Sequence, residues 1–453
     1  MSNELVIVLM FVTLVVGLIV LGVPLGYWLC LVALTAGFIG WGGTAFLHMI
    51  PARIWGIMYN YILVAIPLFV FMGYMLERSG LGEDLFAGGE YLIGKLRGGM
   101  AIMVIMVTTV VAATTGIVAT GVIMAGVLAV PPMLRRQYDK GLALGSVAAG
   151  GTLGILIPPS VMLVLYAALS GLSVGKLFLA AFPAGFILSG LFISYIAIIT
   201  LIRPKMAPKY GEVEELELPG WPRTTSPLEE SAHPRLRALR GILPVTVLLA
   251  GVLGTIIIGL ATPTEAAACG SLGAILITAG YGRLNFKTLK ETCNLTFGTM
   301  GMFALVMIGA MAFTAVLAGL GGRTIIFDLL MGLDIAPMGI LMLILGMVII
   351  AGMFLDDVAI LLLFLPIVLP IQEAMGWHEV WFALVFCVTM QTAWLTPPFG
   401  YALFFIRGLN LPGVTYLDIV KGCTPFILLQ LIGVGICIAF PIITTFLPDL
   451  LIK

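Results

Sequence analysis

The chain has 453 residues, of which 61% are hydrophobic and only 10% are charged. A soluble domain carries about 25% charged residues, so this composition excludes an ordinary soluble protein and is typical of a chain that crosses a membrane many times. The 22 basic and 22 acidic residues cancel, and the six cysteines contain no CxxC pair, so the sequence indicates neither a nucleic-acid partner nor a metal or disulfide framework.

Apolar runs of about 18 residues or more predict ten crossing segments. The first begins at Leu5, with no basic leader before it and no cleavage site after it, so we expect a retained helix and not a signal peptide. The ten predicted crossings are 5–23, 24–47, 56–76, 141–171, 176–202, 242–261, 265–282, 294–320, 379–409 and 421–447.

Two further apolar blocks, 99–133 and 335–372, are somewhat short for two full crossings of about 20 residues each and a turn. The first has the weakly helix-forming sequence ATTG near its middle, and the second has Asp356 beside Asp357. We therefore expect two re-entrant hairpins that dip into the membrane and return, with two short crossings as the alternative in each case. With a re-entrant hairpin or with two short crossings, both ends of each block lie on the same side of the membrane.

A double proline interrupts two of the predicted crossings, 141–171 and 379–409. Proline lacks a backbone N–H and clashes with the preceding turn, so both crossings are predicted to be discontinuous helices. Unpaired backbone at membrane depth is tolerated where it lines a cavity or binds a ligand. The freed carbonyl oxygens can replace the water around a Na⁺, and the amide ends of the half-helices can hold an anion.

The polar, proline-rich segment 203–240 is predicted to be a linker between two halves of the chain, 1–202 and 241–453. A constant offset of 239 residues relates glycines and prolines of the two halves. Each half holds five crossings and one hairpin, and an odd number of crossings turns the second half upside down. The related pairs are Pro24 and Pro263, Gly80 and Gly319, Gly82 and Gly321, Pro131 and Pro370, Pro158 and Pro397, and Pro159 and Pro398.

Charge predicts the orientation of these halves. Basic residues flank the base of the first hairpin and recur in the linker, whereas acidic residues flank the second hairpin. Because basic loops stay in the cytoplasm, we expect the first base and 203–240 in the cytoplasm and the second base in the periplasm. The sequence thus predicts an all-α polytopic membrane protein made of two inverted-topology repeats, each with five crossings, one re-entrant hairpin and a discontinuous helix.

Two hairpin tips and two breaks predict a pair of cation sites, one in each half, built mainly from carbonyl and hydroxyl oxygens. A carboxylate inside an apolar run is functional by default, which adds Asp356. In the first half the predicted cation-binding residues are Thr114, Thr115, Gly116, Gly151, Thr152, Gly154, Ile157, Pro158, Pro159 and Ser160. In the second half they are Gly352, Asp356, Ala393, Thr396, Pro397, Pro398 and Gly400. Substrate contacts are predicted for Thr120, Asp357 and Arg407.

Each of these residues, taken singly, also has a structural explanation. A double proline can simply kink a helix, and a threonine in a membrane helix can bond back to its own chain. An acid at a tip can be solvated, and Arg407 can be an interfacial arginine that reaches toward water. The functional interpretation rests on the combination of these elements: each half has one hairpin tip and one helix break, and the breaks of the two halves are related by the same offset of 239 residues.

Four motifs carry a family resemblance: ATPTEAA at 261–267, GTLGILIPPS at 151–160, GMFLD at 352–356 and LTPPFG at 395–400. At these motifs, and along nearly the whole chain, the sequence resembles the large membrane subunit of the tripartite ATP-independent periplasmic (TRAP) transporters, the DctM family. The resemblance implies an elevator-type secondary transporter of the bacterial cell inner membrane that imports a small organic acid by Na⁺ symport. Na⁺ would be the coupling ion, with no other cofactor.

The resemblance also implies two partners, a periplasmic substrate-binding protein and a small four-helix membrane subunit that is here a separate polypeptide. One stretch departs from the family. Many members carry SGSSAAD at the first tip, whereas this chain has TGIVATG at 115–121, so that Gly121 replaces an acid while Thr115 and Thr120 keep hydroxyls. This departure predicts an altered first site and a substrate other than sialic acid or a C4-dicarboxylate.

The sequence leaves two alternatives to a symporter, a channel within transport and an intramembrane enzyme outside it. A channel would also line its pore with broken helices, and it predicts uncoupled flux without a binding protein. An intramembrane enzyme would need a catalytic constellation, but the chain has no HExxH motif, no GxSxG motif and only three, widely separated histidines. We therefore predict a protein that is not an enzyme, with a channel as the alternative to a symporter.

Overall fold

A computed structural model of the chain describes residues 2–20, 23–41, 44–94, 96–116, 118–209, 212, 216 and 234–452. The first half forms α1 (Asn3–Val20), α2 (Leu25–Trp41), α3 (Met49–Met58), α4 (Ala65–Arg78), α5 (Leu81–Ile93), α6 (Gly99–Thr115), α7 (Val118–Arg135), α8 (Lys140–Thr152), α9 (Val161–Ser170) and α10 (Val174–Ile202). The second half forms α11 (Pro234–Ile257), α12 (Pro263–Gly280), α13 (Phe286–Gly319), α14 (Gly322–Met331), α15 (Pro337–Gly352), α16 (Asp357–Ala374), α17 (Glu379–Leu395), α18 (Tyr401–Gly408), α19 (Tyr416–Ala439) and α20 (Ile442–Leu451).

Every regular element within the described residues is helical, and seven helices there are long and apolar enough to cross a membrane. This confirms the all-helical, multi-pass part of the prediction. Five of the seven coincide with predicted crossings. The other two, α7 and α16, are the second helices of the two predicted hairpins, so helix length alone does not separate a re-entrant hairpin from a pair of crossings.

Some boundaries differ from the prediction. The crossing predicted at 24–47 is wrong in its second part, because α2 ends at Trp41 and the separate helix α3 starts at Met49. The crossing predicted at 421–447 is likewise divided, with α19 ending at Ala439 and α20 following Pro441. The short helices α5 and α14 were not predicted. Most of the predicted linker 203–240 lies outside the described residues.

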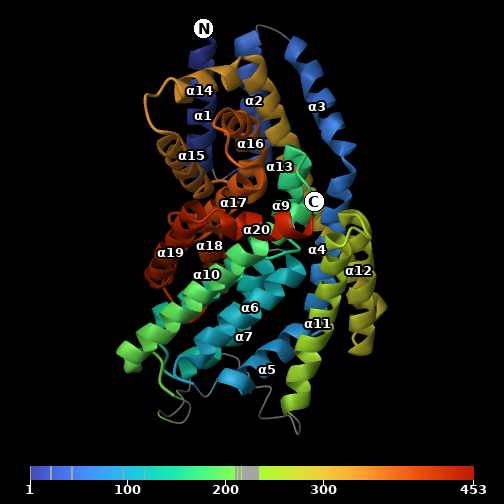
Figure 1. Ribbon diagram of the computed structural model, residues 1–453, viewed down its shortest axis with the longest axis vertical. Coiled ribbons are helices and arrows are strands. Elements are labelled where there is room, and N and C mark those ends of the chain that lie inside the picture. The colour runs from blue at the N-terminus through green and yellow to red at the C-terminus, as the bar shows by residue number, and fades with distance from the viewer. Residues whose placement is uncertain are drawn as a thin grey trace.

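The two hairpins lie in opposite halves of the molecule. Figure 1 shows α15 and α16 in its upper half and α6 and α7 in its lower half, with α9, α17 and α18 between them. The second helix of each hairpin packs on a helix from the other half of the chain. Helix α7 packs on α18, and α16 packs on α9. The same exchange occurs among the remaining helices, where α2 packs on α13 and α12 packs on α4.

The short helices α5 and α14 begin in the same way, directly after a glycine in the left-handed region. Gly80 has φ +80° and Gly321 has φ +78°, values that favour glycine because they crowd a Cβ atom. These two glycines are 241 residues apart, so the pairing of Gly80 with Gly319 does not hold at this turn. The offset of 239 does hold at the double prolines, each of which has a cis peptide bond.

Helices α4 and α12 pack in a regular register. Three α12 hydroxyls spaced seven residues apart lie 3.2, 2.8 and 3.2 Å from carbonyl oxygens of the facing segment; the pairs are Thr264 with Tyr61, Ser271 with Leu68, and Thr278 with Met75. The start of α12 is a capping box in which the backbone N–H of Thr262 donates to the carboxylate of Glu265 (2.8 Å). The ATPTEAA motif therefore begins a helix and lies outside the breaks.

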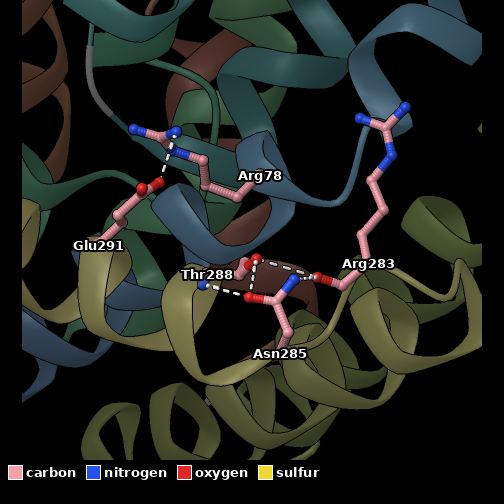
Figure 2. Close-up of polar contacts among 5 residues, drawn as sticks. All are labelled: Arg78, Arg283, Asn285, Thr288 and Glu291. Atoms are coloured by element: carbon pink, nitrogen blue, oxygen red, sulfur yellow. Dashed lines mark hydrogen bonds and ion pairs between the residues drawn. The ribbon is translucent and has the colours of Figure 1, made fainter.

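Figure 2 shows the junction between the end of α4 and the start of α13. Nη1 of Arg78 lies 2.9 Å from Oε2 of Glu291, which joins the two helices by an ion pair. Asn285 caps α13 by accepting a hydrogen bond from the backbone N–H of Thr288 (2.8 Å), and the Thr288 hydroxyl donates to the carbonyl of Arg283 (3.0 Å). These contacts fix the end of α4 beside α12 and α13.

Candidate functional site

The first hairpin tip touches the first break. Gly116 at the tip has φ +60°, and a Cβ added to it would lie 2.8 Å from the carbonyl oxygen of Pro159. Only glycine fits at this contact. Past the break, Ser160 caps α9 by accepting from the N–H of Leu163 (3.4 Å), and its hydroxyl donates to the carbonyl of Ile155. All residues of 151–160 are buried, so the irregular backbone lies inside the protein.

The break begins where α8 ends. Residues Leu153–Ile155 form one tight turn, and helical structure resumes only at Val161. The hydroxyls of Thr114 and Thr152 donate to Val111 (2.7 Å) and Ala149 (2.8 Å) of their own helices. Their hydrogens are therefore used within the helix. The oxygen of Thr114 remains available as an acceptor or ligand, whereas that of Thr152 already accepts two hydrogen bonds. The side chain of Thr115 lies outside the described residues.

The glycine that stands where many family members have an acid faces α8. A Cβ added to Gly121 would lie 3.5 Å from the Cα of Gly151, an ordinary contact distance. Gly151 in turn packs tightly, since its own added Cβ would lie 2.9 Å from the backbone N of Val122. The structure thus brings Gly121 and Gly151 together where α7 passes the end of α8.

The second tip also meets the second break, but through different contacts. A Cβ added to Gly352 would lie 2.5 Å from the Cβ of Ala393, so glycine lets α15 approach the end of α17. The rings of Phe354 and Phe399 are 5.9 Å apart and extend this contact. Thr396, at the break itself, donates its hydroxyl to the carbonyl of Thr392 in α17 (2.8 Å).

Two carboxylates stand at the second tip. Asp356 is only 7% exposed and caps α16, because its Oδ1 accepts a hydrogen bond from the N–H of Ala359 (2.9 Å). Asp357 is partly buried and accepts from the N–H of Val358 (3.0 Å). Capping accounts for one use of Asp356. It does not account for placing two carboxyl groups side by side at a mostly buried tip.

A polar bridge that was not predicted joins the two breaks. Thr152, at the end of α8, accepts hydrogen bonds from Nε2 of Gln391 on α17 and Nε2 of Gln430 on α19, each 3.2 Å long. All three side chains are fully buried, and neither glutamine oxygen has a hydrogen-bond partner among the described atoms. Gln391 lies 239 residues after Thr152, so positions equivalent in the two halves contact each other here. The sequence feature that could have indicated this bridge is a glutamine inside each of the predicted crossings 379–409 and 421–447.

The second break has a further partner that was not predicted. The hydroxyl of Tyr416, at the start of α19, donates to the carbonyl of Pro398 (2.6 Å). The ring of Tyr416 in turn lies under the guanidinium of Arg407, whose Cζ is 5.4 Å from the ring centroid. A cavity of about 340 Å³ opens between these residues and Asn410.

The structure separates the three predicted substrate residues. Arg407 is exposed near the end of α18 and contacts Tyr416, whereas Thr120 is buried in the first turn of α7 and Asp357 lies at the second tip. An apolar cavity of about 220 Å³ lies beside the second break, where Phe354, Phe399 and Tyr401 face Leu18 and Leu25. Among the contacts of the described residues, none joins Thr120, Asp357 and Arg407 to one another.

Glu77 is a carboxylate that sequence reasoning missed. It stands at the end of α4, and its side chain lies near that of Thr120 in the first turn of α7. Glu77 is exposed, whereas Thr120 is only 7% exposed. The sequence feature that could have indicated Glu77 is its position as an acid near the end of an otherwise apolar helix.

Comparison with known proteins gives consistent matches over this architecture. A model of the family described as tripartite ATP-independent periplasmic transporter, DctM component, matches residues 11–443. The C4-dicarboxylate TRAP transporter large permease protein DctM of Pseudomonas aeruginosa is 29% identical over 395 residues, covering 86% of this chain and 87% of the relative. The sialic acid TRAP transporter large permease protein SiaM of Vibrio cholerae is 27% identical over 438 residues, covering 96% of both.

Two other matches concern assembly and fold. The isethionate TRAP transporter permease protein DctMQ of Oleidesulfovibrio alaskensis is 29% identical over 390 residues, covering 86% of this chain and 57% of the relative. Among solved structures, the YdaH transporter of Alcanivorax borkumensis has a TM-score of 0.65 at 16% sequence identity, covering 93% of this chain and 98% of that one. The likeness to that structure concerns the fold alone.

Proposed function

The chain belongs to the DctM component family of tripartite ATP-independent periplasmic transporters, as its motifs predict, and from this premise we propose that it imports a small organic acid by Na⁺ symport. Membership makes it a transporter permease and not an enzyme, and its apolar helices make it a multi-pass membrane protein. Na⁺ coupling, the class of substrate and the bacterial inner membrane as its location are parts of the proposal.

The observation that carries Na⁺ coupling is the seating of a hairpin tip on a broken helix in each half. At the first break, Gly116 lies against the carbonyl oxygen of Pro159, which belongs to no helix. A carbonyl oxygen that leaves a helix inside apolar surroundings and finds no hydrogen-bond donor costs several kcal/mol. A bound Na⁺ would satisfy them, because hard cations prefer oxygen ligands. The residues proposed for the two sites are those predicted from the sequence.

The substrate is proposed to be a small organic anion. The relatives named above are described for C4-dicarboxylate, sialic acid and isethionate, each of which carries a negative charge. In this chain, Arg407 offers an exposed guanidinium beside a cavity of about 340 Å³, next to the second break. Thr120 on α7 and Asp357 at the second tip are proposed as further substrate contacts.

The proposal includes two partners and one kind of movement. Family membership implies a periplasmic binding protein, and the relative named DctMQ is longer than this chain, which is consistent with a small subunit fused to it there. The hairpins and broken helices would move as one unit against α2, α4, α12 and α13, which pack on one another across the two halves.

Uptake into proteoliposomes tests this function. The chain is reconstituted with its small subunit, and the binding protein is added outside with a radiolabelled organic acid. We expect accumulation above the outside concentration only with an inward Na⁺ gradient, and no accumulation when K⁺ replaces Na⁺ or when the binding protein is omitted. Flux that equilibrates the acid without a gradient would identify a channel instead. Robust uptake by the chain alone would contradict the requirement for partners.

A further inference from the structure

A single threonine oxygen connects the two broken helices. Thr152 is the last residue of α8, directly before the first break, and Gln391 lies one helical turn before the end of α17, where the second break begins. Nε2 of Gln391 lies 3.2 Å from Oγ1 of Thr152, and Nε2 of Gln430 on α19 lies at the same distance. The two breaks are therefore linked through one atom.

The direction of these hydrogen bonds follows from the chemistry of the hydroxyl. Thr152 donates its hydrogen to the carbonyl of Ala149 in its own helix (2.8 Å), so its oxygen can only accept. Both glutamines must therefore turn their NH₂ groups toward Thr152. All three side chains are fully buried, and neither amide oxygen has a hydrogen-bond partner among the described atoms. Because a half-satisfied buried amide costs free energy, stability alone does not explain two glutamines here.

Thr152 and Gln430 belong to two helices that pack backbone against backbone. A Cβ added to Gly145 of α8 would lie 2.7 Å from the carbonyl carbon of Gly422 on α19, and one added to Gly422 would lie 2.9 Å from the Cα of Gly141. These glycine contacts hold α8 and α19 together as one body without help from the Gln430 hydrogen bond.

Gln391 connects this body to the second tip. Ala393, two residues further along α17, touches the tip glycine Gly352, since a Cβ added to Gly352 would lie 2.5 Å from the Cβ of Ala393. At the other end of the path, Gly151 in the last turn of α8 packs on Val122 of the first hairpin. A continuous set of contacts thus runs from the second tip to the first hairpin, and Gln391 supplies the hydrogen bond between α17 and α8 on this path.

We propose that Gln391 is a positioning residue that couples the two cation sites, so that Na⁺ bound at one break favours the geometry that binds Na⁺ at the other. The inference rests on the proposed Na⁺ coupling and adds how the two ions act together. Na⁺ at the second site fixes the end of α17, Gln391 then holds Thr152, and Thr152 sets the point at which α8 gives way to the first break. The bridge lies within the unit proposed to move, because α19 packs on both α8 and α17.

The Na⁺ dependence of uptake and of thermal stability tests this assignment. The chain, reconstituted with its small subunit, is assayed for the Hill coefficient and the half-maximal Na⁺ concentration of uptake. Melting temperatures in detergent are recorded over the same range of Na⁺, with K⁺ as the reference. For the parent we expect a Hill coefficient above one. For Gln391→Met we expect a Hill coefficient of about one and a half-maximal Na⁺ concentration about threefold higher, the square root of a coupling of about tenfold between two equal sites.

The matched control is Gln430→Met, which removes the other amide from the same acceptor. Because glycine contacts already hold α8 to α19, both Na⁺ readouts should stay at the parent value. Without Na⁺ the two variants should have similar melting temperatures, since each loses one hydrogen bond of the same length. Thr152→Ser keeps the acceptor oxygen and should keep the Hill coefficient of the parent. If Gln391→Met cannot be recovered folded, Gln391→Leu replaces it with the same expected shift.

The outcomes separate this inference from the proposed function. A parent protein with Na⁺-dependent uptake and a Hill coefficient of about one would overturn the coupling between the sites and leave Na⁺ symport standing. An unchanged Hill coefficient in Gln391→Met, or an equal fall in Gln430→Met, would overturn the role of Gln391 alone. A parent protein with no Na⁺ response in either assay would overturn Na⁺ symport and this inference together.

Discussion

Asp356 combines a structural and an electrostatic property in one side chain. Its carboxylate accepts the N–H of Ala359 and so begins α16, yet it is also a charge at a nearly buried tip. Asparagine caps helices as well as aspartate does, because its side-chain oxygen can accept the same hydrogen bond. Replacing Asp356 by Asn therefore removes the charge and keeps the helix start.

We expect Asp356→Asn to abolish Na⁺-coupled uptake while changing thermal stability by no more than about 1 kcal/mol, the usual size of a capping effect. Asp357→Asn should have a milder effect on uptake, since Asp357 is less buried and only Asp356 lies within the GMFLD motif. Uptake, melting temperature and protein abundance are measured on the same membranes. Wild-type Na⁺-dependent uptake in Asp356→Asn would exclude this residue from the second site.

The bridge at Thr152 gives a second prediction at this scale. Thr152 is the acceptor for two buried amides, so Thr152→Val should leave both without a partner at a cost of about 1–3 kcal/mol each. We expect a clear fall in melting temperature for Thr152→Val and almost none for Thr152→Ser, which keeps the oxygen. A Thr152→Val protein as stable as the parent would show that water replaces the lost acceptor.

At the scale of elements, the sequence located the features that depend on local chemistry. The double prolines lie within both helix breaks, because proline acts on its own turn. The helices α5 and α14 were missed, because a glycine in an apolar sequence does not reveal whether the chain turns there. Gln391 was missed as a site residue for another reason: its contact with Thr152 depends on how two distant helices are placed.

The first break gives a prediction about this element as a whole. Replacing both Pro158 and Pro159 by Ala should let α8 continue into the break and draw its carbonyls back into helical hydrogen bonds. The variant should be at least as stable in detergent as the parent, yet transport poorly and need much more Na⁺. Melting temperature and the Na⁺ dependence of uptake are measured on one preparation. If stability and uptake fall together while the Na⁺ requirement stays constant, the prolines only shape the fold.

At the scale of the whole molecule, the predicted inversion of the two halves can be tested by accessibility. Basic residues around 283–290 predict that this loop is cytoplasmic, and acidic residues around 373–379 predict that the other is periplasmic. Lys287 and Glu379 are both exposed, so cysteines introduced there can react. In a background without native cysteines, an impermeant reagent added to intact spheroplasts should label Glu379→Cys and spare Lys287→Cys until the membrane is opened. Equal labelling of the two would contradict the inverted topology.

The hydroxyl register between α4 and α12 also has a consequence for motion. Three hydroxyl–carbonyl contacts share one alignment, although Ser271 and Thr278 also donate to carbonyls of α12 itself. A slide of about 5.4 Å, one helical turn, would break all three together. The two helices should therefore keep a constant separation throughout a transport cycle and serve as a stationary reference. Cys269 on α12 is exposed, so a spin label on it provides a fixed origin once the other cysteines are replaced. The displacement of either hairpin is then measured as the change in distance from this label to a second one on the hairpin.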